Sequence, residues 1–596
     1  MALGTGVNGL GDLGIDGMGG GMGIGDLGGR GSNEDEVKRR LDEVLGILSV
    51  SKGRLSAAGV ERLAQRLGLD LMWQDNMRTN SKTLIIAGPA HVALDIDFVN
   101  DTVIKVALSF PDSPEIVTRY TEKAGDILLR DLKVGPKENR FTKVLDRFAA
   151  NLQRLASLDK LSGNPGLNCH EAVARVYESL EKLHLWEVKK VQEEQAEMKG
   201  RDYGYMERLA MCTKSGKPVM HTRDRLGLSL DYWQNKRFIT AKSLQHENEK
   251  TWALLVECAA LPLAEMMVFP PLRASQDWIS KKILKEDAQV DLFDLTQVQL
   301  DWLEPDATVV ASKPDAMESV ESSTQKVDVI FIAKFDPPLI VPFQLAMTIY
   351  NSTNAPFDMY HQSTFDGLMF PQNAAEILDG NSGSRSISSE TTIKIPSKNG
   401  DEWRSRKHKN TLLIDKIGYG RTLTELPFSH PRQLVEMLPS LRQYAFLSSL
   451  LSKTFGAGTE PGPIKETPKD KLVSKQDEFE AFMTPPPPSS KPTIPSSGIG
   501  GGRKEAELKL DISLQIEPDK VRLRLVFPWR KRMADVTFLV KLNGVVEVES
   551  ENLLVGNSVG VGNGKGKELR REDLGRVLEV CEDLGVWVEW VVRRLG

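Results

Sequence analysis

The feature of this sequence that most constrains its fold is a change of hydrophobic period between residues 83 and 186. The first part alternates apolar with polar residues, as strands with one buried face do. The alternating apolar residues are Val92, Leu94, Ile96 and Phe98, then Ile104, Val106, Leu108 and Phe110. Residues 83–110 are therefore predicted to form a three-stranded meander that turns at Asn100-Asp101. Its apolar face needs a helical cover.

Helical signals follow directly. Ser113, Pro114 and Glu115 are typical of a helix start, with serine as cap, proline in the first position and an acid in the first turn. Apolar residues then recur every three or four positions, which predicts helices over residues 141–161 and 168–186. The charged residues 187–199 fit either an extension of the last helix or a linker. Two further helices are predicted before the sheet, over 34–50 and 59–69.

The middle of the chain favours strands from residue 203 onward. Alternation or apolar runs predict strands at 226–233, 252–256, 327–335 and 412–414, and a helical stripe follows at 431–452. A Ser-rich stretch at about 379–409 predicts a mobile insertion. Beyond a Pro- and Gly-rich linker, strands are predicted from residue 508, with a hairpin turn at Asn543-Gly544, one helix over 571–584 and an apolar end at Trp587, Val588 and Trp590.

These segments predict a multi-domain α+β protein. The expected parts are a disordered Gly-rich tail (1–33), an N-terminal helical unit with a small antiparallel sheet (34–199), a β-rich middle domain (200–455), a disordered linker (456–505) and a small C-terminal α+β unit (506–596). No apolar run approaches the roughly 18–20 residues that a membrane helix needs, so no membrane partner is expected. The four cysteines form no C-x-x-C pair and favour a reducing compartment, cytosol or nucleus.

Candidate catalytic groups are few. Asp95 and Asp97 could bind a divalent ion, but strand alternation already accounts for them as solvent-facing residues. The eight histidines show no metal-binding spacing, and neither a kinase nor a nucleophile-elbow pattern has its required context. No catalytic, cofactor or metal site is predicted, and no cofactor is expected. An enzyme with a non-motif site around His221, Asp224 and Asp231 is the alternative.

A basic run borders the Ser-rich stretch. It contains Arg404, Arg406, Lys407 and Lys409, and it fits a nuclear import signal, a phosphate-facing patch or a solvated loop. The net charge of −5 gives no electrostatic reason to expect duplex DNA as the main partner. Direct, sequence-specific DNA binding is therefore not expected, although a DNA binder stays open as a third interpretation.

Two further motifs bear on regulation. Leu447, Leu450 and Leu451 form an L-x-x-L-L motif that could dock in a partner's groove, but the same stripe starts at Leu434 and favours core packing. Thr467 and Thr484 each precede proline in the linker and are candidates for phosphorylation, or are ordinary linker residues.

Ten longer stretches carry a family resemblance. They are GVERLA (59–64), LIIAG (84–88), LSFP (108–111), SPEIV (113–117), DRFAANL (146–152), LDKL (158–161), RLGLSLDYW (225–233), SHPRQ (429–433), VFPWR (526–530) and EDLG (572–575). Together they resemble the fungal form of the Mediator complex subunit 1 family. The resemblance covers residue 55 to the C-terminus, apart from the Ser-rich insertion and the linker.

The resemblance implies a function without catalysis. It implies a nuclear scaffold in the middle module of Mediator, a transcription coactivator that bridges gene-specific regulatory proteins and RNA polymerase II. The implied partners are other Mediator subunits, with activators and the polymerase machinery reached indirectly. Animal members of the family bind nuclear receptors through L-x-x-L-L motifs in a disordered region, whereas the motif here lies in a predicted helix.

Overall fold

The structure is a computed structural model. The residues it describes are 38–41, 52–76, 81–135, 138–139, 142–163, 167–195, 203–235, 237–238, 250–261, 272–285, 299–306, 309–311, 324–326, 328–360, 363–371, 385–396, 403–414, 418–456, 507–517, 520–554 and 569–595. Within them, helices and strands are both abundant, so the α+β prediction is confirmed. No helix of the described residues is long and apolar enough to cross a membrane.

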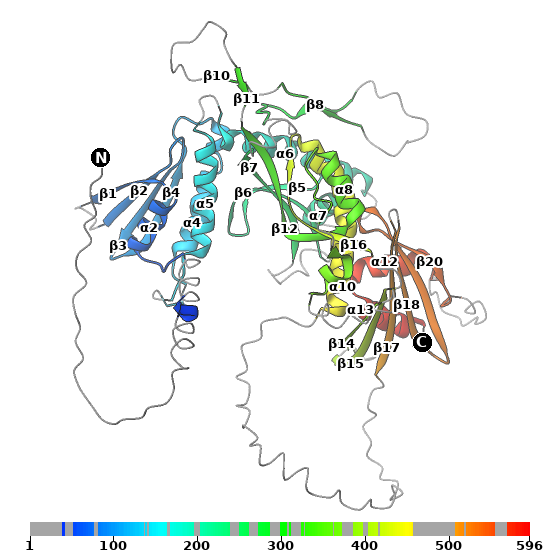
Figure 1. Ribbon diagram of the computed structural model, residues 1–596. Helices are drawn as coiled ribbons and strands as arrows, with labels where there is room; N and C mark the ends of the chain where they lie inside the picture. Colours follow the sequence, from blue (N-terminus) through cyan, green and yellow to red (C-terminus); the bar gives the residue numbers. More distant parts are fainter. Residues whose placement is uncertain are drawn as a thin grey trace, which may run out of the picture.

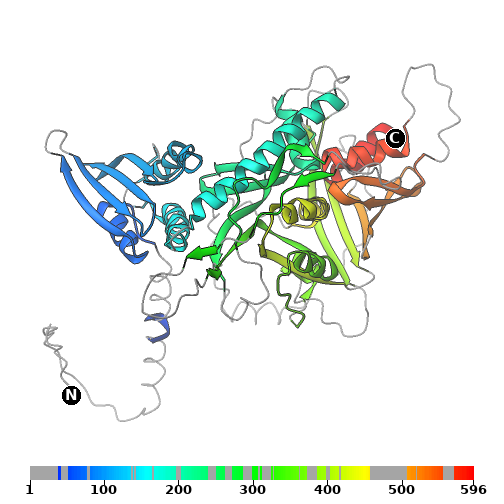
Figure 2. The ribbon, with the colours of Figure 1, turned by 90° about the horizontal axis from the view of Figure 1, so that it is seen from above.

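The N-terminal unit is an antiparallel sheet with helices on one face (Figures 1 and 2). Its strands, paired in chain order, are β1 (Asp70–Asn76), β2 (Ser81–Ala87), β3 (Ala93–Val99) and β4 (Thr102–Ser109). Its helices are α2 (Ala57–Arg66), α3 (Glu115–Thr118), α4 (Thr121–Leu132) and α5 (Asp146–Leu161). The sequence did not predict β1, because this edge strand exposes the neighbouring Met72 and Trp73 and so lacks a clean alternation.

A bulge changes which residues of β4 face the core. The pairing of β3 with β4 shifts between Asp97 and Phe98, so Phe98 lies opposite Val103. Val103 is buried, whereas Ile104, predicted to face the core, is 54% exposed. Asp95 is exposed, as the alternation predicts. The inward alternation of β3 is confirmed, and that of β4 is wrong at one position.

Helix α6 (Cys169–Glu194) joins the N-terminal unit to the rest of the protein (Figure 2). Asn168 caps it by accepting a hydrogen bond from the Glu171 backbone N–H at 3.0 Å. Ala174 packs in the N-terminal core, whereas Leu180 packs in the central one. The helix continues to Glu194, so the extension is the correct interpretation of the charged segment after Trp186.

The prediction of strands from residue 203 is wrong for the first segment. Tyr203–Thr213 form a helix, α7, which packs on the end of α6. Buried Tyr205 and Leu209, four positions apart, face Val188 and Val191 of α6. The helical spacing was present in the sequence, but its short apolar run resembles that of a buried strand.

The middle sheet has six strands in the order β13-β16-β12-β7-β6-β5, all antiparallel. The strands are β5 (Lys217–Thr222), β6 (Arg225–Gln234), β7 (Thr251–Ala260), β12 (Val329–Pro342), β13 (Ser363–Thr364) and β16 (Tyr419–Phe428). The helices that follow or connect them are α8 (Phe343–Ser352), α9 (Phe365–Met369) and α10 (Pro431–Phe455). Short strand pairs lie beside it: β8 (Ile279–Leu284) with β9 (Leu300–Trp302), and β10 (Val309–Ala311) with β11 (Thr324–Lys326).

The segment predicted as a mobile insertion contains a long hairpin. Its strands β14 (Arg385–Pro396) and β15 (Trp403–Ile414) pair over their whole length. The hairpin forms the first two strands of a second six-stranded sheet. The other strands of this sheet are β17 (Leu508–Glu517), β18 (Lys520–Trp529), β19 (Arg532–Val540) and β20 (Val546–Glu551). Serine and threonine suit the exposed face of a strand, and this explains why composition alone suggested a loop.

The C-terminal segment completes the middle of the protein and shares its core. Strand β17 pairs in parallel with β15, and the buried residues of both sheets belong to one hydrophobic cluster. The end of the chain forms two helices, α12 (Arg571–Cys581) and α13 (Leu584–Leu595), separated where Glu582 takes a φ of 49°. The boundary predicted near residue 506 therefore separates two parts of a single packed unit, and the single predicted last helix is two.

Two buried arginines fix the turn between β19 and β20 to the middle sheet. This turn, η4 (Leu542–Gly544), receives two hydrogen bonds from Arg237, at 2.6 Å to the Asn543 carbonyl and 2.7 Å to the Gly544 carbonyl. Arg442 of α10 donates to the Asn543 side chain. Gly544 has a φ of 64°, and a Cβ there would lie 2.8 Å from the Trp233 ring.

Candidate docking surfaces

The three groups of the alternative active site do not form one site. His221 is partly buried, and its Nδ1 accepts the Gly227 backbone N–H at 3.1 Å. Burial, with Lys123 nearby, lowers the pKa of His221 to about 4, so the ring is neutral at physiological pH. His221 lines a large cleft, and neither Asp224 nor Asp231 is among the residues that line it.

Both acids are held by arginines. Asp231 is buried and accepts hydrogen bonds of 2.6 and 2.8 Å from Arg223. Asp224 lies 2.8 Å from Arg130 and 3.4 Å from Arg147. Carboxylates held by arginines in this way have a structural role. The arrangement offers no support for the enzyme interpretation, and no group of three His, Cys, Asp or Glu side chains in the described part of the chain is placed to hold a metal ion.

The cleft that His221 lines, here called the main cleft, lies between the N-terminal unit and the middle sheet. It has a volume of about 980 Å³. Helices α3, α5 and α6 form one side, and strands β5, β6, β7, β12 and β16 form the other. Apolar side chains dominate its walls; they include Ile116, Val117, Tyr120, Leu155, Leu158, Leu161, Val173, Met220, Leu255 and Cys258. Such a cleft suits the apolar face of a peptide segment or helix.

Charged side chains of the cleft are arranged in pairs. Glu257 lies 2.6 Å from Lys334 and 3.4 Å from Arg154. Arg225 lies 2.6 Å from Asp336. Burial, and next the charge of Arg225, lowers the pKa of Arg154. Because each of these charged side chains has a neighbour of opposite sign, this part of the cleft does not require a charged ligand.

Asn151 fixes one wall of this cleft. It is buried on α5 and donates 2.8 Å to Asp131 and 3.0 Å to the Asp224 carbonyl. Its side-chain oxygen accepts the Leu226 backbone N–H at 3.0 Å. Burial raises the pKa of Asp131, and the hydrogen bond from Asn151 partly opposes that effect. This contact joins α5 to the turn between β5 and β6. In the sequence, Asn151 is a polar residue directly beside the apolar stripe, within the DRFAANL stretch (146–152) that carries the family resemblance.

Asp159 of α5 makes a second buried contact that connects two elements of the N-terminal unit. Its carboxylate accepts backbone N–H groups of Ala90, His91 and Val92 at 2.9, 2.8 and 3.0 Å. Burial alone would raise the pKa of Asp159, but the neighbouring His170 and these backbone donors outweigh burial and lower it. The loop between β2 and β3 is thereby tied to α5. In the sequence, Asp159 lies in the LDKL stretch (158–161) that carries the family resemblance, but no local pattern shows this role.

The basic run is divided between the two faces of β15. Arg406 points inward and lies 3.3 Å from Glu589 of α13, next to buried His408. Lys407 and Lys409 are exposed on the opposite face, and Arg404 is also exposed. The backbone of the run is paired with β14. Nuclear import stays a prediction, and it would have to use side chains on a folded strand, because the solvated-loop interpretation is wrong.

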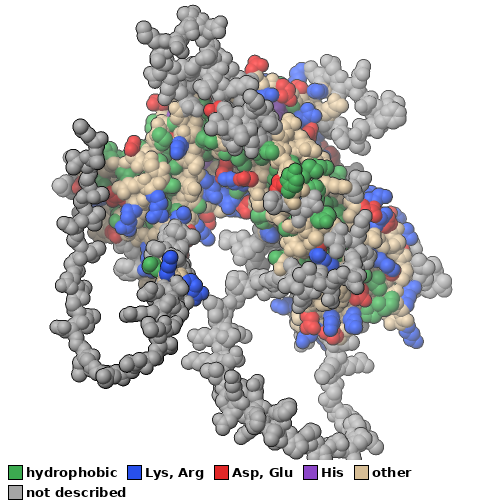
Figure 3. All heavy atoms as spheres, in the orientation of Figure 1, with side chains coloured by type: hydrophobic (Ala, Val, Ile, Leu, Met, Phe, Trp, Pro, Cys, Tyr) green, Lys and Arg blue, Asp and Glu red, His purple; other side chains and the backbone are tan. Residues whose placement is uncertain are grey.

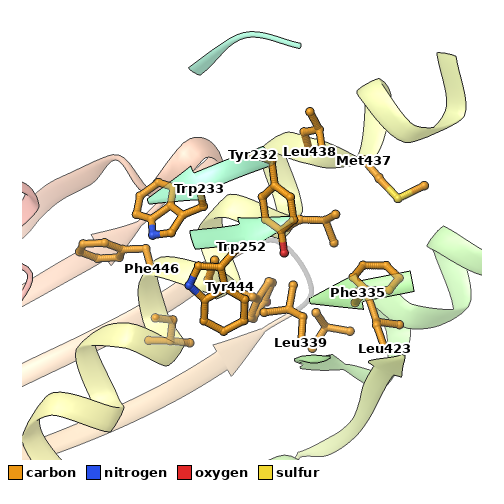
Figure 4. Packing of buried hydrophobic residues seen from close by; sticks show 14 of the residues in the cluster. Tyr232, Trp233, Trp252, Phe335, Leu339, Leu423, Met437, Leu438, Tyr444 and Phe446 are labelled. Carbon is orange, nitrogen blue, oxygen red and sulfur yellow. The ribbon is translucent and has the colours of Figure 1, made fainter. Parts of the chain in front are cut away.

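The L-x-x-L-L motif lies in the core. Leu447, Leu450 and Leu451 of α10 are each 0% exposed and belong to the central hydrophobic cluster. Figure 4 shows the same helix packed on the middle sheet through Tyr444 and Phe446, with Phe446 6.1 Å from the Trp233 ring. Core packing is confirmed, and the docking interpretation of these leucines is wrong for this fold. Thr467 and Thr484 lie outside the described residues, so their phosphorylation stays a prediction.

The fold and its surfaces define a large α+β protein whose main cleft suits binding of a peptide segment. Residues 42–456 match the model of a family described as Mediator of RNA polymerase II transcription subunit 1. The chain therefore belongs to this family, and it is a Mediator complex subunit that acts in the regulation of RNA polymerase II transcription. No individually curated protein matches the chain. The resemblances at 526–530 and 572–575 lie beyond the matched residues.

Proposed function

We propose that this protein is a non-catalytic scaffold of the Mediator middle module. It docks neighbouring subunits and thereby connects gene-specific regulatory proteins to RNA polymerase II in the nucleus. The observation that carries the proposal is the cleft between the N-terminal unit and the middle sheet. Every element that lines it lies within residues 42–456, the part of the chain that matches the family.

The cleft is suited to an apolar segment of a neighbouring subunit. Leu158 and Leu161 lie one turn apart on α5 and are only partly buried, so they are available to a partner. Lys160 and Lys334 lie among the lining residues and leave the rim polar, as in protein interfaces generally. The buried contacts of Asn151 hold the wall rigid, which reduces the ordering entropy lost on binding.

Affinity purification of the tagged, full-length chain tests this proposal. The wild type should recover other Mediator subunits of the middle module. Leu158→Glu places a charge in the cleft at a half-buried position, so it should reduce that recovery at least about tenfold if the segment's burial contributes on the order of 1.4 kcal/mol. Met533→Glu, at a 49% exposed position on β19, is the matched control and should behave as wild type. Equal recovery by all three proteins would reject the cleft as the docking site, and no recovery at all would reject the scaffold role.

A further inference from the structure

One end of the second six-stranded sheet carries a concentration of exposed cations. Strands β15 and β17 are parallel and both begin at this end, and β18 turns into β19 there. Figure 3 shows Lys and Arg side chains along this lower end of the sheet, around the point where β17 begins in Figure 1. We call this surface the basic end. Its exposed side chains are Lys407, Lys409, Lys509, Arg530, Lys531 and Arg532.

The strand register brings these cations together from segments that are far apart in the chain. Lys409 and Lys509 lie directly opposite each other in the parallel pairing of β15 with β17, and both are exposed. Lys407 is two positions before Lys409 and therefore faces the same side of the sheet. The antiparallel register of β17 with β18, continued by two residues, places the end of β18 and the turn at residues 530–531 next to Lys509. Since strands lie about 4.8 Å apart, the basic end is roughly 15 Å wide from β15 to β19.

Two arginines of the basic end are held in place by their neighbours. The guanidinium groups of Arg530 and Arg532 lie over the Trp529 ring, 4.6 and 4.8 Å from its centroid. Arg530 also donates a hydrogen bond to the carbonyl of Leu595, in the last turn of α13. Side chains fixed in this way lose little conformational entropy when they bind an anion.

The lysines of the basic end differ from the arginines farther along β18, which have acidic partners. Arg522 lies 3.0 Å from Glu549, and Arg524 lies 2.6 Å from Asp535. The lysines of the basic end make no ion pair with any carboxylate in the described part of the chain. Their charges are therefore available to an anion from outside the protein.

The surroundings of the basic end leave it positive. Three exposed acids lie in the same part of the sheet: Glu390, opposite Lys409 on β14, and Glu507 and Asp511, on either side of Lys509. The last turn of α13, which Arg530 contacts, adds two more exposed arginines at positions 593 and 594. Although the whole chain has a net charge of −5, cations outnumber acids at this end of the sheet.

We propose that the basic end of the second sheet binds the phosphate backbone of duplex DNA without reading its sequence. The lysines and arginines replace counterions along the backbone, as in other sequence-independent complexes. The chain belongs to a family that acts in RNA polymerase II transcription, and duplex DNA is the polyanion of that process. Such a contact adds affinity for DNA and leaves the choice of sequence to the gene-specific regulatory proteins.

The composition of the basic end favours duplex DNA over other anionic partners. Cores of protein–protein interfaces are apolar and depleted in lysine, whereas protein–DNA interfaces are polar and strongly positive. Single strands are usually bound through exposed aromatic rings on which the bases stack. Trp529, the ring beneath the two arginines, is only 3% exposed and so cannot serve in this way. The basic end is separate from the main cleft, and the proposal does not depend on the role in the middle module.

Fluorescence anisotropy of a labelled duplex of about 20 base pairs, titrated with the isolated full-length chain, tests the proposal. Two duplexes of unrelated sequence should bind with equal affinity at about 50 mM salt. The logarithm of the affinity should fall linearly with the logarithm of the salt concentration, by about 0.9 for each phosphate contact. Absence of binding at this low salt concentration would overturn the proposal.

A charge-reversed variant locates the binding. The double variant Lys509→Glu/Lys531→Glu should bind the duplex at least about tenfold more weakly and with a smaller salt dependence, because two phosphate contacts are lost. The matched control is Lys520→Glu/Lys541→Glu, which makes the same charge change at exposed positions at the opposite end of β18 and β19. The control removes one exposed pair with Glu547, a small effect on stability, and should bind DNA as wild type does. Equal affinity of the two double variants would contradict the assignment of the site.

Competition with other polyanions tests the class of partner. The competitors are a single strand of the same sequence, duplex RNA of the same length and polyglutamate. Unlabelled duplex DNA should displace the labelled duplex at the lowest concentration. Stronger competition by any of the other three would overturn the assignment of duplex DNA as the partner.

Photo-crosslinking gives an independent test of the location. Met533 is 49% exposed at the start of β19, beside the basic end, and Leu542 is 53% exposed at the other end of this strand. A photo-crosslinking residue at position 533 should crosslink to the duplex, and one at position 542 should not. Crosslinks from position 542 alone would show that DNA binds elsewhere and would overturn the proposal. Because these measurements use the isolated chain, their failure leaves the recovery of Mediator subunits unaffected, so the two failures are distinguishable.

Discussion

Arg442 donates a hydrogen bond of 2.8 Å to the side-chain oxygen of Asn543, 101 residues further along the chain. The same guanidinium donates to the carbonyls of Tyr232 and Met211, at 3.0 and 2.9 Å. It is 1% exposed, and burial lowers its pKa to about 10, so it stays charged at physiological pH. One side chain of α10 thus holds together β6, α7 and the turn before β20.

We expect Arg442→Met to destabilise the protein by about 3–5 kcal/mol, because several buried carbonyl groups would lose their donor. The loss should appear as a lower midpoint of thermal unfolding. Arg432→Met, on the same helix, removes only an exposed pair with Glu436 and should cost less than about 1 kcal/mol. A change for Arg442→Met as small as that of the control would show that its hydrogen bonds contribute little.

Separate expression tests the attachment of the C-terminal segment. Chains that contain residues 1–456 and 507–596 should associate when they are produced together, because parallel pairing of β15 with β17 and a common core join them. Co-purification through a tag on the longer chain measures the association. Arg237→Ala should weaken it, since Arg237 donates to the carbonyls of Asn543 and Gly544. Recovery of the longer chain alone, folded and without its partner, would contradict the shared core.

Much of the fold could be predicted from local sequence. The alternation that buries Leu94 and Ile96, and the helical stripe of α10, are each visible as a period of apolar residues within a single element, and both are confirmed. The hairpin β14–β15 was missed because its pairing with β17 joins residues about 100 positions apart. Serine-rich strands of this kind show no alternation strong enough to be recognised alone.

The candidate sites were predicted less well, for a related reason. Leu447 and Leu451 fit both a docking motif and a core stripe in sequence; the stripe from Leu434 favours the core, and tertiary packing confirms it. Asn151 and Asp159 lie in stretches that carry the family resemblance, but no local pattern shows their roles, which come from the side chains and backbone groups next to them. The division of the basic run follows from strand geometry, which places Arg406 and Lys407 on opposite faces.

Asp159 should make stability sensitive to acid. Its pKa is lower in the folded protein than its ordinary value of 3.8, so its contribution is present above that value and is lost as pH falls through the folded pKa. Asp159→Asn should reduce stability at pH 7 by about 2 kcal/mol and flatten this acid dependence. Urea unfolding at pH 7 and near pH 3 measures both effects. Asp75→Asn, at an exposed pair with Lys82, should change little; an equal loss for both variants would contradict the assignment.

Glu187 should have the opposite pH dependence. Burial raises its pKa to about 7, and hydrogen bonds from the backbone N–H and hydroxyl of Ser215, at 3.0 and 2.7 Å, only partly oppose this. Stability from the neutral carboxyl is therefore fully present below the unfolded value of 4.5 and is lost as pH rises through about 7. Glu187→Gln should gain up to about 3 kcal/mol over wild type between pH 5 and pH 8. Thermal unfolding of both proteins across this range measures the difference. If the difference in melting temperature were the same at every pH, Glu187 would not titrate there.

Crosslinking of purified Mediator with a lysine-reactive reagent tests the central claim most directly. Lys160 and Lys334 line the main cleft and come from opposite walls, α5 and β12. If the cleft binds a neighbouring subunit, both lysines should crosslink to one segment of that subunit, and Leu158→Glu should remove these crosslinks while leaving those of Lys509, on β17, unchanged. Recovery of the intact complex with both cleft lysines free of crosslinks to any other subunit would contradict the account.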